Sequence, residues 1–130
     1  MTGLDTNILI RYLTQDDPEQ FQAALRLLNR KGATFFVPDL VLVEIDWVLS
    51  GVYGWKRDEI AETFARLLTV HNLVFEDEGR IRSALKSVRS GADLADALIA
   101  AVSQERGCRE LATFDKGLLR HFSKLAFAPK

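Results

Sequence analysis

The stretch ATFFVPDLVLVEIDWVLSG, residues 33–51, predicts a short buried strand that leads directly into a helix. Residues 33–38 are mainly apolar and end at Pro38, which cannot donate a hydrogen bond within a sheet. From Asp39 onward the apolar character continues for longer than an ordinary strand, and an acid is favourable in the first turn of a helix. A strand followed at once by a helix is typical of α/β proteins.

The same alternation continues in both directions along the chain. Strands are predicted at 2–5, 33–38, 73–76, 110–115 and 125–128, and helices at 7–13, 18–30, 39–54, 56–70, 77–89, 93–107 and 116–122. Strands that are continuously apolar and alternate with helices favour a parallel sheet covered on both faces. A chain of 130 residues has the length of one domain, so we expect a single α/β domain over residues 1–130.

Composition excludes several classes of protein. The net charge of −1 gives no basic excess, so any contact with nucleic acid must come from local patches. One cysteine and two histidines exclude an intrachain disulfide and disfavour a zinc site. No apolar run reaches the roughly 20 residues that span a bilayer, and no secretory signal precedes the first strand. We expect a cytoplasmic protein without a membrane partner.

Two acids stand at the ends of predicted strands. Asp5 and Asp115 each close a strand and precede a helix. In a parallel sheet the carboxyl ends of the strands meet at one edge, where ligands bind. Both acids also suit the role of helix cap, because their side-chain oxygens accept free backbone N–H groups. Position alone leaves capping and chemistry open.

A third candidate acid interrupts an apolar helix. Glu44 and Asp46 lie roughly 200° apart around a helical axis, so one solvent-facing side cannot expose both. An unpaired carboxylate is costly to bury. We therefore expect Glu44 to face a polar cavity or a cation.

The last acids lie three residues apart on one helix. Asp93 and Asp96 are neighbours on the same face, although each also suits the first turn, where acids are stabilised. Carboxylates about 4 Å apart repel by roughly 4 kcal/mol at an intermediate dielectric. Acids that converge at one sheet edge therefore need a cation or a shared proton, and hard oxygen ligands suit Mg²⁺ or Mn²⁺. An ion held in this way is suited to phosphodiester hydrolysis.

Four segments resemble, in order and spacing, the PIN-domain ribonucleases, and most closely the VapC toxins of bacterial toxin–antitoxin pairs. They are GLDTNILIRYL at 3–13, LVEIDWVL at 42–49, DLADALIAA at 93–101 and ATFDKGL at 112–118. The resemblance implies a three-layer α/β/α sandwich with a central parallel sheet and a Mg²⁺- or Mn²⁺-dependent endoribonuclease. It also implies a homodimer, inhibited by a VapB-type antitoxin, that acts on RNA.

The resemblance also assigns the site. The catalytic metal ligands of the family fall on Asp5, Glu44, Asp96 and Asp115, with Asp93 as a secondary ligand. Supporting polar residues fall on Thr6, Asn7 and Thr113.

Basic side chains are the candidates for RNA contact. Arg11 and Lys116 stand next to the acid motifs and are preferred. Arg82, Lys86 and Arg89 share one predicted helix face and are equally typical of a solvated surface. The aromatic residues are expected in the core or at interfaces rather than as platforms for bases.

Three other classes remain as alternatives. A receiver-like signalling domain would need an acid pair after the first strand and a lone Asp after a central strand. A dehalogenase-type phosphatase would need a second Asp where Asn7 stands. A catalytically inactive PIN-like module that binds RNA or protein retains the same fold.

Overall fold

The computed structural model describes residues 1–130 and contains seven helices and five strands. The chain divides into two compact units, Met1–Glu76 and Asp77–Lys130, and each is described by itself.

The first unit contains a parallel sheet of three strands. Its strand order is β1-β2-β3, and the bounds are β1 Thr2–Gly3, β2 Phe35–Val37 and β3 Leu73–Phe75. In the register, Phe35 lies between Thr2 of β1 and Leu73 of β3. Phe35 and Val37 are fully buried, so the central strand forms part of the core.

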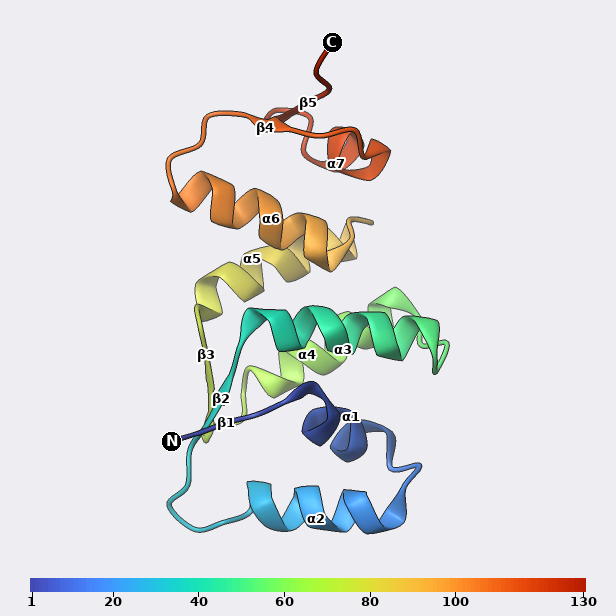
Figure 1. Cartoon of the computed structure of the whole chain (residues 1–130), viewed down its shortest axis with the longest axis vertical. Coiled ribbons are helices and arrows are strands. Elements are labelled where there is room, and N and C mark those ends of the chain that lie inside the picture. The colour runs from blue at the N-terminus through green and yellow to red at the C-terminus, as the bar shows by residue number, and fades with distance from the viewer. The chain divides into compact units, whose positions relative to one another are not determined.

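Four helices connect these strands, since parallel neighbours require crossover connections. They are α1 Thr6–Thr14, α2 Pro18–Leu28, α3 Asp39–Gly51 and α4 Arg57–Leu67. Helix α1 packs against α2 and α3, and α3 packs against α4 (Figure 1). The predicted start of α2 is confirmed, because the Asp17 carboxylate accepts the backbone N–H of Gln20 and Pro18 occupies the first turn.

The second unit contains a helical pair and a short parallel ladder. Its elements are α5 Glu78–Arg89, α6 Leu94–Glu105, β4 Leu111–Ala112, α7 Lys116–His121 and β5 Ala126–Phe127. Helix α5 packs against α6, and β4 pairs with β5 (Figure 1). Arg80 of α5 donates to the carboxylate of Glu105 at the end of α6, with Nη2 2.7 Å from Oε2.

The structure confirms the α/β class, every predicted strand and helix, and the parallel pairing of the strands. It differs from the sequence prediction in two respects: the strands form two sheets rather than one, and they are shorter than predicted, with β4 covering Leu111–Ala112 where 110–115 was expected. Strands β4 and β5 have two residues each and pair with one another. The single domain remains a prediction. None of the helices has the length and apolar character needed to cross a membrane.

Candidate functional site

Asp5 joins the end of β1 to the start of α1. Its Oδ1 atom accepts the backbone N–H of Thr6 at 2.8 Å, and the residue is exposed. The capping interpretation of this acid is confirmed, and its role as a metal ligand stays a prediction. One carboxylate oxygen caps the helix, and the other is left for a ligand at the carboxyl edge of the sheet.

Beside it, Thr6 carries a buried hydroxyl group with no hydrogen-bond partner. The residue is 5% exposed, and its Oγ1 atom contacts no donor or acceptor. An unsatisfied buried polar group costs about 1–3 kcal/mol. The hydroxyl is closed off from solvent, so the assignment of Thr6 as a supporting residue of the site stays a prediction. Asn7, the next residue, is exposed and lines an open groove between α1 and α2.

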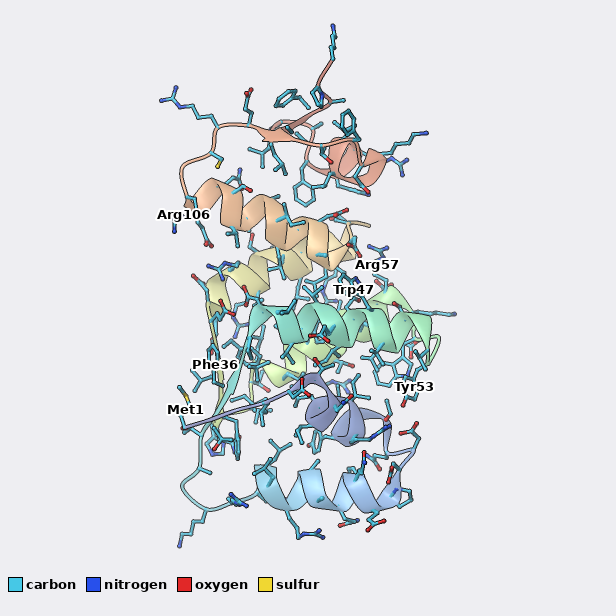
Figure 2. The ribbon with its side chains drawn as sticks, viewed as in Figure 1. Met1, Phe36, Trp47, Tyr53, Arg57 and Arg106 are labelled. Carbon is cyan, nitrogen blue, oxygen red and sulfur yellow. The ribbon has the colours of Figure 1, made fainter.

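Glu44 is half-buried in α3, between the buried Val43 and Ile45. Its carboxylate makes no hydrogen bond or ion pair, whereas Asp46, also half-buried, has a partner. The same helix exposes Trp47 (Figure 2), which is 56% accessible. The predicted half-burial of an acid within this apolar helix is thus observed for Glu44, while the polar cavity or cation that it was expected to face stays a prediction.

Three more candidate acids lie in the second unit. Asp93 is the residue before α6, but its side chain makes no capping hydrogen bond. Asp96 lies in the first turn of the same helix. Asp115 caps α7, with Oδ1 accepting the backbone N–H of Leu118 at 2.9 Å. The hydroxyl of Thr113 accepts the backbone N–H of Asp115 at 2.9 Å and fixes the turn that carries this acid.

Asp96 and Asp115 approach each other at Gly117. A Cβ atom built on Gly117 would lie 3.0 Å from Asp115 Oδ1 and 3.6 Å from Asp96 Oδ2. The two oxygens therefore lie within roughly 7 Å of one another, close enough for their charges to repel. Because glycine has no side chain, residue 117 places no Cβ atom against either carboxylate.

The electrostatic environment of Asp96 reflects this crowding. Burial raises the pKa of Asp96, the charges of Asp93 and then Asp115 raise it further, and His121 opposes them. A like-charged neighbour disfavours the ionised form of a carboxylate, and a bound cation reverses that preference.

The donor set fits a hard cation. The side chains at issue are carboxylates, which suit Mg²⁺ and Mn²⁺ rather than softer metals. No group of three or more histidine, cysteine, aspartate or glutamate side chains is arranged as a ready metal site. The structure brings Asp96 and Asp115 together with Asp93 near them, while Asp5 and Glu44 belong to the first unit.

The residues predicted to contact RNA differ in whether their side chains already form hydrogen bonds or ion pairs within the protein. Arg11 is engaged, because its Nε atom donates to Gln20 Oε1 at 2.6 Å and its Nη1 atom pairs with Asp16 at 3.3 Å. Lys116 is exposed directly after Asp115 and has no ion pair.

The three basic residues of α5 that were predicted to contact RNA, Arg82, Lys86 and Arg89, are exposed. Arg82 pairs with Glu78 one turn earlier at 3.8 Å, and Arg89 also has an interaction partner. This arrangement is that of an ordinary solvated helix face as much as of an RNA-binding surface.

The sequence analysis did not identify two residues of the second unit that lie near the candidate acids in sequence or in space. Phe114 was expected in the core or at an interface, yet it is 80% exposed directly before Asp115. A core position is therefore wrong for Phe114, and its place in the polar run TFDK is the signal that pointed outward. Gly117 gave no signal, because its role depends on where α6 and α7 meet.

Comparison with known proteins defines the class. The PIN domain family matches residues 4–127, so the chain belongs to the PIN-domain family. The resemblance carried by the four sequence motifs is thus confirmed, and a receiver domain and a dehalogenase-type phosphatase are set aside.

Within that family, a VapC ribonuclease of Aquifex aeolicus (strain VF5) is similar along nearly its whole length. It is 31% identical over 131 residues, which cover 98% of this chain and 93% of the relative.

Proposed function

We propose that this chain is a metal-dependent endoribonuclease and the toxin of a VapBC-type pair. The observation that carries the proposal is the convergence of Asp96 and Asp115 at Gly117, with Asp93 near enough to raise the pKa of Asp96. The sequence match to a VapC ribonuclease supports the same activity.

In this proposal the carboxylates bind the metal ion, and two of them are held in place by backbone hydrogen bonds. Asp5, Glu44, Asp96 and Asp115 would hold Mg²⁺ or Mn²⁺, with Asp93 as a secondary ligand. When bound, such an ion would activate water and balance the charge that develops on a phosphodiester. Asp5 and Asp115 each fix one oxygen on a backbone N–H group. Each therefore presents its other oxygen in a defined direction, as a preorganised ligand must.

The other two primary ligands, Asp96 and Glu44, are not held by hydrogen bonds. Asp96 and Glu44 make no hydrogen bonds or ion pairs with protein donors, so metal binding would break no existing hydrogen bond or ion pair. Ionised Asp96 is disfavoured by burial and by its neighbours until a cation is present. Cleavage therefore depends on both the metal and a pH at which Asp96 is ionised.

Partners follow from the same assignment. We propose RNA as the substrate, a VapB-type antitoxin as the inhibitor, a homodimer and a cytoplasmic location. Lys116 is the best placed cation for RNA, because it is exposed and unpaired beside Asp115. Arg11 would first have to leave Gln20 and Asp16.

The test is cleavage of total bacterial RNA by the purified protein with Mn²⁺, with chelator, and with Asp96→Asn as the control for contaminating nuclease. We expect discrete fragments with Mn²⁺ that are absent from the other two reactions. Fragments that persist with Asp96→Asn would overturn the site. Absence of any metal-dependent cleavage would favour a PIN-like binding module.

A further inference from the structure

The residue directly before Asp115 carries an exposed aromatic side chain. Phe114 is 80% accessible, the highest value among the large hydrophobic residues of the chain. It directly precedes Asp115, whose carboxylate approaches that of Asp96. Burial of an apolar ring is favourable, so an exposed ring forgoes that free energy. The exposure of Phe114 directly before Asp115 therefore needs an explanation.

The backbone around Phe114 is fixed although its ring is free. On the preceding side, the N–H of Thr113 donates to the carbonyl oxygen of Phe127 at 2.9 Å. On the following side, the N–H of Asp115 donates to the Thr113 hydroxyl, and the Asp115 carboxylate caps α7. The ring is thus presented from a rigid turn and not from a loose loop.

The chemistry of the neighbouring acids indicates what the ring contacts. A phosphodiester brought to Asp96 and Asp115 places its flanking bases close to these carboxylates. Unpaired bases stack on aromatic side chains, and a neutral ring gains this contact without adding charge to an acidic site. The bases of a duplex are already stacked and do not offer their faces.

We propose that Phe114 is the stacking platform for an unpaired base next to the scissile phosphodiester. The proposal rests on the proposed ribonuclease function and deepens it, because it assigns Phe114 of this chain to contact with a base of the substrate. Stacking tolerates all four bases. Phe114 therefore sets strandedness and affinity, and not sequence.

The experiment measures binding of a short single-stranded RNA of random sequence by fluorescence anisotropy, with Ca²⁺ in place of Mn²⁺ to suppress cleavage. The variants are Phe114→Ala, Phe114→Trp and, as control, Val52→Ala, whose side chain is similarly exposed at 76%. We expect Phe114→Ala to weaken binding roughly 5- to 100-fold. Phe114→Trp and Val52→Ala should bind as the natural chain does.

A second RNA separates stacking from other effects. In this RNA the bases are removed and the sugar–phosphate backbone is kept. The natural chain should bind it more weakly, and Phe114→Ala should then show no further loss. An equal loss on both RNAs, or no loss on either, would overturn the proposal. A change in self-association or antitoxin binding with unchanged RNA binding would assign the ring to a protein partner instead.

Cleavage by the natural chain with Mn²⁺, measured alongside, separates the two proposals. If the natural chain cuts RNA and Phe114→Ala binds and cuts equally well, stacking fails and the nuclease stands. If the natural chain cuts nothing but binds RNA through Phe114, the nuclease fails and the stacking platform stands.

Discussion

Gly117 offers the sharpest test of the second-unit carboxylates, because a methyl group there disturbs two of them without removing either. In Gly117→Ala the new Cβ atom would stand 3.0 Å from Asp115 Oδ1 and 3.6 Å from Asp96 Oδ2. Asp115 Oδ1 is also held by the backbone N–H of Leu118 at 2.9 Å. The methyl group therefore pushes on an oxygen that another contact holds in place.

The chain supplies a matched control in Gly79. Asp77 caps α5 by accepting the N–H of Arg80 at 2.9 Å, with the same spacing of cap, glycine and donor as in α7. A Cβ atom on Gly79 would lie 3.3 Å from Asp77 Oδ1 and meet no second carboxylate. Gly79→Ala thus reproduces the change in backbone freedom without touching the candidate site.

The expected magnitudes differ for stability and for activity. Alanine is favoured over glycine in a helix by about 0.5–1 kcal/mol. Gly79→Ala should show most of this gain, whereas the closer contact in Gly117→Ala should cancel it. A misplacement of about 1 Å can cost 100-fold in rate. A shift of a few tenths of an ångström should therefore lower kcat/KM by roughly 2- to 10-fold.

Three measurements decide the matter: thermal unfolding, Mn²⁺ affinity by calorimetry, and the rate of RNA cleavage. Gly117→Ala should bind Mn²⁺ more weakly and cut more slowly, with Gly79→Ala unchanged in both. If Gly117→Ala gains the same stability as Gly79→Ala and keeps full Mn²⁺ affinity and activity, the meeting of Asp96 and Asp115 plays no part in the reaction.

Two further predictions concern pH. Because the pKa of Asp96 is raised in the folded chain, the natural chain in chelator loses stability as pH rises above the ordinary Asp range. Asp96→Asn should then be more stable at neutral pH by about 1 kcal/mol, from the removed repulsion. It should lose that advantage in acid and gain less from Mn²⁺; lower stability of Asp96→Asn at neutral pH would contradict this. The second prediction concerns Asp16, whose pKa is lowered where that of Asp96 is raised. The main cause is the hydroxyl of Tyr53 (Figure 2), which donates to Asp16 Oδ2 at 2.6 Å. That contribution is present above the ordinary Asp pKa and is lost as pH falls. Tyr53→Phe should thus melt below the natural chain at neutral pH, and the two melting curves should merge in acid; a gap that persists at low pH would assign the effect to packing.

The sequence predicts this fold well because its local signals agree with one another. Pro38 ends β2, Asp17 and Pro18 start α2, and the apolar runs distinguish strands from helices by length. The positions of Asp5 and Asp115 directly before helices follow from the same patterns. Such features depend on neighbours in sequence, which is why they are accessible without coordinates.

The remaining features depend on residues that are distant in sequence. Asp93 looks like a helix cap, yet its side chain caps nothing. The meeting of Asp96 with Asp115 at Gly117 depends on the packing of α6 and α7. The exposure of Phe114 depends on how β4 turns into α7. The pairing of β4 with β5 in a separate sheet likewise lies beyond local pattern.

The double duty of Asp5 and Asp115 affects how substitutions in relatives should be interpreted. Each carboxylate begins a helix with one oxygen, so a descendant that had abandoned nuclease activity would still be selected to keep both acids for folding. Asp96 accepts no hydrogen bond from the protein, and its charge is disfavoured where it lies. Genetic drift would remove it first. If Asp96 holds the metal as proposed, its survival, more than that of Asp5 or Asp115, marks a chain of this family that still cuts RNA.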